Sequence, residues 1–370
     1  MTLSLTLENA DVLRPDGVAQ SDLSLHEGLI VEGLAGRKVD LSGFRIMPGI
    51  IDVHGDGFER HLAPRRGAMT DLTVGLASTE ADLAANGITT AMLAQFWSWE
   101  GGMRGPKFAK RMLNALDEYQ SLGTDMRVQL RFETHMLEDY DEIIEVVRQH
   151  GIGFVVFNDH LPHEALDKGK RPPRLTGQAL KGGRSPEVHL EMLKALHANG
   201  PQVATALAGL AARLADLGVI MGSHDDRTAE TRIQARDMGL RVSEFPETHG
   251  AAVEAHRAGD PVVLGAPNAV RGGSHSGNVS ASDLIAKGVG DALASDYHYP
   301  APLQAALALE NWRLVSEGPA RLLGLEDRGV LLPGKRADLV VLDSRGRVGA
   351  TIAGGRVTHL AGEVAARFIG

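Results

Sequence analysis

The chain has 370 residues, of which 43% are hydrophobic and 23% charged, a composition typical of folded globular proteins and unlike disordered, collagen-like or coiled-coil chains. Its net charge of −9 argues against a general nucleic-acid binder, because such a protein presents a basic surface. The chain contains no cysteine, so disulfides, cysteine-bound zinc and cysteine nucleophiles are excluded, and metal ligands have to be histidines or carboxylates. The N-terminus lacks the features of a signal peptide, and no apolar run reaches the roughly 18 residues of a membrane span. We therefore expect a cytoplasmic protein without a membrane partner.

Both ends of the chain have the pattern of short strands and turns. Because chain termini often lie close together, we predict that residues 1–46 and 329–370 form one small β-sandwich domain. The predicted strands of this domain are Leu3–Leu7, Gly28–Glu32, Asp338–Leu342 and Val357–Leu360.

In residues 47–328, apolar strands alternate with segments of helical periodicity. The predicted strands are Ile50–Val53, Ile88–Leu93, Arg127–Phe132, Gly153–Phe157, Val219–Gly222, Leu240–Ser243, Pro261–Leu264 and Asp291–Ala294. The predicted helices include Lys107–Leu122, Asp139–Gln149, Pro186–Ala198, Gln202–Leu217, Ala229–Met238, Ser282–Lys287 and Pro302–Val315. Each strand–helix unit then has about 35 residues, and a βα unit needs about 30. The predicted fold class is α/β, a (β/α)8 TIM barrel. An open doubly wound sheet is the alternative, but its usual glycine-rich fingerprint is missing after the first strand.

Polar residues follow five of the predicted barrel strands, where barrel enzymes carry their catalytic groups. His54 and Asp56 come after the first strand and point to the same side, because they are two residues apart. The residues after four later strands are Glu133, His160, His224 and Asp296. Imidazole and carboxylate groups together bind divalent metals, so the set predicts a metal site. By contrast, His163, His249 and His256 are interpreted as surface histidines.

A glycine-rich segment, residues 265–278, follows the seventh predicted strand. Its glycines and successive N–H groups can form an anion nest, and barrels often bind phosphate in the loops after strands seven and eight. We predict anionic substrate binding here, with a mobile surface loop as the alternative. The predicted substrate-binding residues are Arg271, Ser274, His275 and Asn278. Arg65 is a further candidate for clamping an oxyanion, although a solvated charge explains it equally well.

Several motifs resemble one protein family. The segments MPGIIDVHGD and GKRADLVVLD resemble the opening strand and the C-terminal β segment of the amidohydrolase superfamily. Within it, GSHDD at 222–226, GAPNAVRGGSHSGN at 265–278 and ASDY at 294–297 are similar to the phosphonate-metabolism branch, the PhnM-like hydrolases. The resemblance covers the whole chain.

This resemblance implies a (β/α)8 barrel with a small β domain and one or two divalent metal ions, with Zn, Mn and Fe as candidates. It implies hydrolysis of a small phosphorylated partner, α-D-ribose 1-methylphosphonate 5-triphosphate, to the 5-phosphate and pyrophosphate. By position, the resemblance assigns proton transfer to Asp296. It assigns metal binding to His54, Asp56, Glu133, His160 and His224, with His275 in reserve.

Two other functions stay open at this point. A paralogue could hydrolyse a C–N bond of a cyclic amide, N-acyl or amidine substrate, since similar metal chemistry attacks carbonyl and amidine carbons. A metal-containing binding protein without turnover is the other alternative. The sequence leaves the metal and any homo-oligomer undetermined.

Overall fold

The structure is a computed structural model that describes residues 2–65, 68–69, 71–273 and 277–370. The chain divides into two compact units. The first unit comprises Met1–Leu93, Tyr119–Arg127 and Val263–Gly370, and the second comprises Ala94–Glu118 and Val128–Val262.

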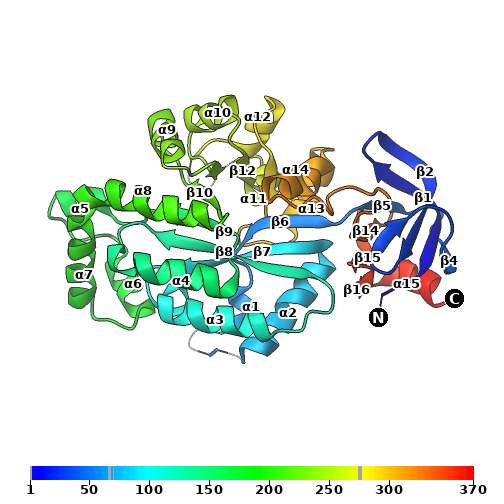
Figure 1. The fold of residues 1–370 in the computed structure, drawn as a ribbon, viewed down its shortest axis with the longest axis horizontal. Coiled ribbons are helices and arrows are strands. Elements are labelled where there is room, and N and C mark those ends of the chain that lie inside the picture. The colour runs from blue at the N-terminus through cyan, green and yellow to red at the C-terminus, as the bar shows by residue number, and fades with distance from the viewer. Residues whose placement is uncertain (1, 66–67, 70, 274–276) are drawn as a thin grey trace. The chain divides into compact units, whose positions relative to one another are not determined.

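Both ends of the chain contribute to one mixed sheet in the first unit (Figure 1). Its strands are β1 (Leu5–Arg14), β2 (Gly17–His26), β3 (Leu29–Val31), β4 (Arg37–Asp40), β5 (Arg45–Pro48), β14 (Leu339–Leu342), β15 (Val348–Ala353) and β16 (Arg356–Leu360). Strand β1 pairs antiparallel with β2 and parallel with β4 and β5. The two ends join where β14 pairs antiparallel with β5. This confirms the predicted joining of the termini, whereas the exact domain boundaries stay a prediction.

The terminal sheet owes its stability to one buried face. Leu7, Val12 and Leu25 of this face are fully buried in a cluster that also contains Val364 and Phe368. Both of these residues belong to α15 (Gly362–Ile369), which therefore covers the sheet (Figure 1). Burial of such side chains contributes about 1.5–3 kcal/mol each.

Asp338 makes the stability of this sheet depend on pH. Burial raises the pKa of the Asp338 carboxyl to about 6, against the attraction of Arg336 at 3.1 Å. Since the folded state holds this proton more tightly than the unfolded state, the stabilisation is complete below pH 3.8 and is lost as the pH rises through about 6. Asp338→Asn is expected to remove this dependence, worth up to about 3 kcal/mol. Urea unfolding of both proteins between pH 4 and 8 measures it, and parallel stability curves would contradict it.

Eight parallel strands form the second sheet. They are β6 (Ile50–Gly55), β7 (Ile88–Trp97), β8 (Asp125–Glu133), β9 (Phe154–Asn158), β10 (Ile220–His224), β11 (Val242–Glu244), β12 (Val262–Gly265) and β13 (Ala292–Ala294). Their order in the sheet is their order in the chain, and a bridge between Gly55 and Asp296 joins the ends of the first and last strands. The predicted α/β class and (β/α)8 barrel are thus confirmed.

Most predicted barrel helices are present. They are α3 (Pro106–Glu118), α4 (Tyr140–His150), α7 (Pro186–Ala198), α8 (Gly200–Asp216), α9 (Ala229–Asp237) and α12 (Ala281–Ala286). The predicted helix Pro302–Val315 is wrong as a single element, because it divides into α13 (Ala301–Ala308) and a 3₁₀ turn, η3 (Trp312–Val315). Glu310 takes a left-handed backbone with φ of 50° between them, and Trp312 Nε1 donates to the carbonyl of Pro48 at 2.9 Å. The tertiary contact thus interrupts the helical periodicity.

Other helices were not predicted. They are α1 (Glu59–Leu62), α2 (Leu72–Ala85), α5 (His163–Asp167), α6 (Leu175–Lys181), α10 (His249–Arg257), α11 (Ala266–Arg271), α14 (Glu317–Leu322) and α15, with the 3₁₀ turns η1 (Gly102–Arg104) and η2 (Leu137–Asp139). The start of α2 carried a readable signal, because Asp71 accepts hydrogen bonds from the N–H groups of Thr73 and Val74 as an N-cap.

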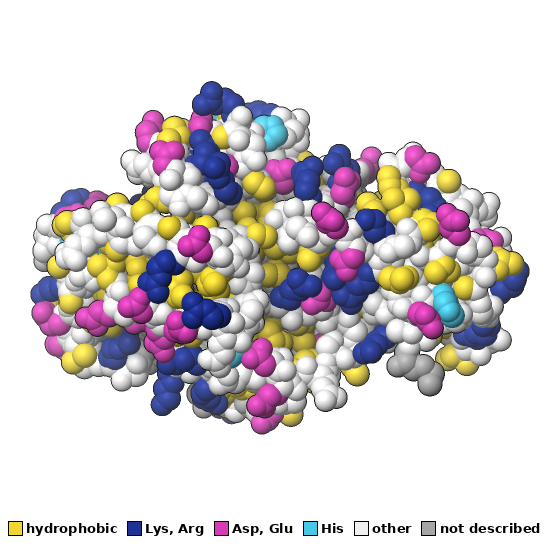
Figure 2. Space-filling model, viewed as in Figure 1, with side chains coloured by type: hydrophobic (Ala, Val, Ile, Leu, Met, Phe, Trp, Pro, Cys, Tyr) yellow, Lys and Arg dark blue, Asp and Glu magenta, His cyan; other side chains and the backbone are white. Residues whose placement is uncertain are grey.

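Two observations concern the kinds of partner that the protein could bind. Within the described ranges, none of the helices has the length and apolar character needed to cross a membrane. Figure 2 shows basic and acidic side chains interspersed on the face that it draws.

Candidate active site

Glu133 and His160 form a tight pair in the second unit. Glu133 is the last residue of β8 and is 1% exposed, while His160 lies just after β9. The Nδ1 of His160 lies 2.5 Å from Glu133 Oε1, and the backbone N–H of His160 and the indole of Trp99 donate to Oε2. Burial by itself raises the pKa of Glu133, but these bonds and the charge of His160 outweigh it and lower the pKa. The carboxylate is therefore ionised at neutral pH.

His224, the last residue of β10, is held between a carboxylate and a guanidinium. Its Nδ1 lies 2.8 Å from Glu244 Oε2, and Arg131 donates to its Nε2 at 2.7 Å. The ring donates from Nδ1 to the carboxylate, so its Nε2 lone pair accepts from Arg131, and a cation bound at this nitrogen would take the place of the guanidinium. Burial, with the charge of Arg131, lowers the pKa of His224, so the ring is neutral, as a metal ligand must be.

These side chains fit a divalent cation. One ligand atom each from His160, His224 and Asp225 lies within 4.8 Å of the others, and the rings of His160 and His224 are 5.8 Å apart. Nitrogen and oxygen donors without sulfur suit zinc, manganese or iron. The second unit therefore contains a candidate metal-ligand group.

The first unit brings together the ends of β6 and β13. His54 is fully buried in β6, and its carbonyl accepts the N–H of Asp296 at 2.9 Å. The N–H of Asp56 in turn donates to the carbonyl of Asp296 at 2.9 Å. Two of the predicted residues, His54 and Asp56, are thus tied through the backbone to the predicted proton acceptor.

A buried carboxyl supports this strand end. Asp52 accepts hydrogen bonds from the N–H of Ser295 at 2.9 Å and its hydroxyl at 2.5 Å. Burial raises the pKa of Asp52 to about 6 in spite of these bonds. A Cβ on Gly55 would lie 2.7 Å from the Asp52 carboxyl and 2.9 Å from the Tyr299 ring, so only glycine fits between them.

Backbone strain concentrates at these strand ends. Asp225, Phe245 and Asp296 have positive φ values of 60°, 53° and 54°. They directly follow His224, Glu244 and Ser295. Non-glycine residues adopt this conformation at a cost of about 1–3 kcal/mol, and they cluster at functional sites. The carboxyl ends of β10, β11 and β13 thus share this strained backbone with Asn9, Glu27 and Glu310, which lie elsewhere in the fold.

The structure describes only some of the predicted anion-binding residues. Arg271, at the end of α11, is exposed and donates to the hydroxyl of Tyr297 at 3.0 Å. Asn278 and Arg65 are both exposed, and the backbone of Arg65 forms an isolated β-bridge with that of Ala68. Ser274 and His275, including the reserve-ligand role of His275, lie outside the described residues.

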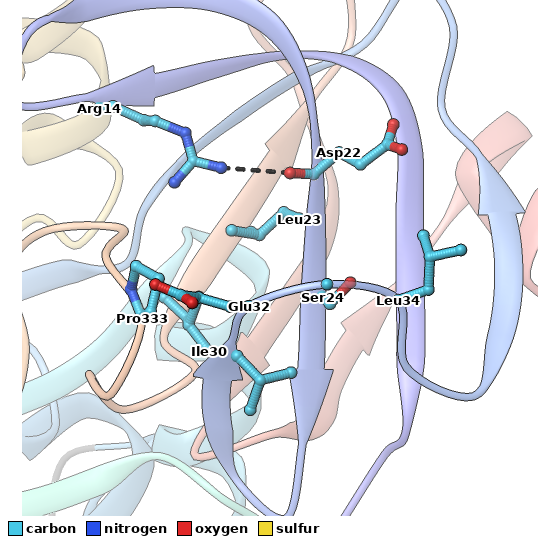
Figure 3. Close-up of a pocket in the computed structure, with 10 residues that line it drawn as sticks. Arg14, Asp22, Leu23, Ser24, Ile30, Glu32, Leu34 and Pro333 are labelled. Atoms are coloured by element: carbon cyan, nitrogen blue, oxygen red, sulfur yellow. Dashed lines mark hydrogen bonds between the residues drawn. The ribbon is translucent and has the colours of Figure 1, made fainter.

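A pocket of about 320 Å3 lies in the terminal sheet, and none of the predicted site residues lines it. Arg14 directs its guanidinium at the carbonyl of Asp22 (Figure 3). It also donates to the carbonyl of Leu331. These bonds use two of the five N–H donors of Arg14, and the carboxylates of Asp22 and Glu32 also line the pocket, so its lining does not favour an anionic substrate.

Sequence reasoning missed Arg131, Asp225 and Glu244. Glu244 follows the predicted strand Leu240–Ser243, and Arg131 lies two residues before Glu133, on the same side of its strand. The rule that found the other candidates would therefore have found Glu244, whereas Arg131 lies inside its predicted strand. Their partners could not be read from the sequence.

A comparison with protein-family models finds no match. A protein of Escherichia coli (strain K12), the alpha-D-ribose 1-methylphosphonate 5-triphosphate diphosphatase, is 32% identical over 322 residues, covering 82% of this chain and 84% of that protein. The chain belongs to the alpha-D-ribose 1-methylphosphonate 5-triphosphate diphosphatase family. Membership of this diphosphatase family confirms the predicted enzyme class, a hydrolase.

Solved structures support the fold of this diphosphatase-family member. An amidohydrolase matches with a TM-score of 0.67 and 15% identity, covering 97% of this chain and 100% of that chain. The N-acetylglucosamine-6-phosphate deacetylase of Pasteurella multocida matches with a TM-score of 0.62 and 14% identity, covering 96% and 99%. At these identities the likeness shows the amidohydrolase fold alone.

Proposed function

We propose that this chain hydrolyses α-D-ribose 1-methylphosphonate 5-triphosphate to the 5-phosphate and pyrophosphate. The observation that carries the proposal is the 32% identity with the E. coli diphosphatase over most of both chains. The proposed partner is thus a small phosphorylated molecule, and neither nucleic acid nor a membrane takes part.

The proposed metal ligands are His54, Asp56, Glu133, His160 and His224, with Asp225 as an addition. They would hold one or two divalent cations, with zinc, manganese and iron as candidates. A bound cation supplies a Lewis acid that stabilises the negative charge developing on the phosphate oxygens. The chemistry of the donor set in the second unit supports this assignment.

The remaining steps belong to the side chains. Asp296 accepts the proton of the attacking water, and its backbone bonds with His54 and Asp56 hold it at the strand end. Arg131 and Glu244 orient the imidazole of His224. Arg271 and Arg65 neutralise the phosphate charge, and Ser274, His275 and Asn278 orient the triphosphate by hydrogen bonds.

The test is a product assay on the purified chain loaded with Mn²⁺ or Zn²⁺. We expect pyrophosphate and the 5-phosphate in equal amounts from the ribose methylphosphonate triphosphate. Orthophosphate as the released product, or no turnover with either metal, would contradict the proposal. A parallel panel of cyclic amide, N-acyl and amidine substrates tests the C–N alternative.

Arg271→Ala is expected to raise KM for the triphosphate by about 10–100-fold, because an Arg–phosphate contact contributes roughly 1.5–3 kcal/mol. Steady-state kinetics of pyrophosphate release measure this change. Arg257→Ala is the matched control, since Arg257 is an exposed arginine that pairs with Glu254 at 2.9 Å. An unchanged KM in Arg271→Ala would remove this residue from the substrate site.

A further inference from the structure

Four side chains of the second unit converge outside the candidate ligand group described above. His135 follows β8, Asp159 follows β9, His163 begins α5 and His197 lies in the last turn of α7 (Figure 1). His163, interpreted from the sequence as a surface histidine, is partly exposed and lies beside two other imidazoles. Its ring centroid lies 4.8 Å from that of His135 and 5.0 Å from that of His197.

Three of these side chains direct potential metal-ligating atoms toward one another. His163 Nε2 lies 2.9 and 3.0 Å from the two Asp159 oxygens, and His135 Nδ1 lies 3.6 Å from Asp159 Oδ1. One ligand atom from each of the three residues lies within 4.8 Å of the others. Two ligands on a tetrahedral zinc are about 3.3 Å apart, given Zn–N distances of about 2.0–2.1 Å. The spacing is thus close to that of a metal site.

The hydrogen-bond chain behind His163 can be satisfied in two ways, by protons alone or with a bound cation. His163 Nδ1 lies 2.7 Å from His197 Nδ1, and His197 Nε2 lies 3.0 Å from Asp167 Oδ1. With protons alone, both Nε2 atoms have to donate to carboxylates and a third proton has to lie between the Nδ1 atoms. Two rings then carry three protons, so one of them is an imidazolium.

A cation on His163 Nε2 satisfies the same chain with neutral rings. The Nδ1–H of His163 then donates to His197 Nδ1, and the Nε2–H of His197 donates to Asp167. Such outer partners fix the tautomer and orientation of metal-ligating histidines. Each imidazole nitrogen of this hydrogen-bond chain then donates a proton, accepts one or binds the cation.

We propose that His135, Asp159 and His163 bind a divalent transition-metal ion, Zn²⁺, Co²⁺ or Ni²⁺, at a second site of this protein. His197 and Asp167 orient His163 within it. The side chains of Asp159 and His163 are 42% and 34% exposed, so the site is open to ions from solvent. His135 lies two residues after Glu133, and Asp159 directly precedes His160. An ion at the second site would therefore fix the two chain segments that carry the Glu133–His160 pair.

The test is a titration of the metal-stripped full chain with Co²⁺ alone, followed by visible absorption and elemental analysis. We expect His163→Gln and Asp159→Asn each to bind one equivalent fewer than the wild type. His197→Gln should retain that equivalent with affinity reduced by about 10–100-fold. His150→Gln is the control, because it removes an imidazole that contacts Asp117 in the same manner and should bind as the wild type does.

A second variant separates this proposal from the proposed function. His160→Ala/His224→Ala, which removes two of the proposed catalytic ligands, should keep the equivalent that His163→Gln loses. The proposal is overturned if Asp159→Asn, whose side chain keeps its shape, and His163→Gln bind as much Co²⁺ as the wild type with equal affinity. Identical binding would mean that protons alone hold the cluster.

Discussion

Asp296→Asn is expected to lower kcat for pyrophosphate release by about 10²–10⁴-fold, the range of a lost general base. Asn keeps the shape of Asp and tolerates the positive φ of 54° at this position. The backbone bonds to His54 and Asp56 should therefore survive. What disappears is the carboxylate that accepts the proton.

The kinetics need two companion measurements. Elemental analysis should show the same metal content in Asp296→Asn and the wild type, and thermal unfolding should occur at a similar temperature. Asp216→Asn, at the exposed end of α8, is the control and should retain full activity. Activity within about tenfold of the wild type would rule out Asp296 as the general base.

The second large effect concerns stability. Arg232 of α9 is fully buried and donates to Asp226 Oδ2 at 3.2 Å and to Ser223 Oγ at 2.7 Å. It also lies 3.6 Å from Asp260, which is 3% exposed. Burial lowers the pKa of Arg232 although both carboxylates oppose this shift. Arg232→Met would leave two buried carboxylates without this counter-charge.

Removing one partner of a buried ion pair costs about 3–5 kcal/mol, and we expect Arg232→Met to destabilise the chain by that amount. Urea unfolding with an unchanged m value measures it. The control is Arg257→Met, which removes a 75% exposed side chain that pairs with Glu254 and should cost no more than about 1 kcal/mol. A loss below about 1 kcal/mol in Arg232→Met would show that Arg236, 2.6 Å from Asp260, compensates.

The barrel was readable from the sequence because most of its strands are short segments rich in apolar residues. Such runs are a local property, and every predicted barrel strand is present within a few residues of its predicted limits. The helix between Pro302 and Val315 was predicted wrongly because Trp312 bonds to Pro48, 264 positions away. The local periodicity of the sequence cannot predict a contact between residues so far apart in the chain.

The candidate site, too, could be predicted from the sequence only in part. His160 and His224 were predicted from their places after strands, and the structure brings them together. The contacts of His163 with His135 and His197 could not be predicted, because these residues lie in other parts of the chain.

The sequence by itself determined the fold class, the diphosphatase family and the restriction of metal ligands to histidine and carboxylate. These follow from local patterns, motifs and the absence of cysteine. Only the tertiary structure decided which nitrogen of His224 donates and which accepts, because Glu244 and Arg131 contact them from other strands. Arg131 lies 93 positions from His224, and pairings over such separations are determined by packing of the folded chain.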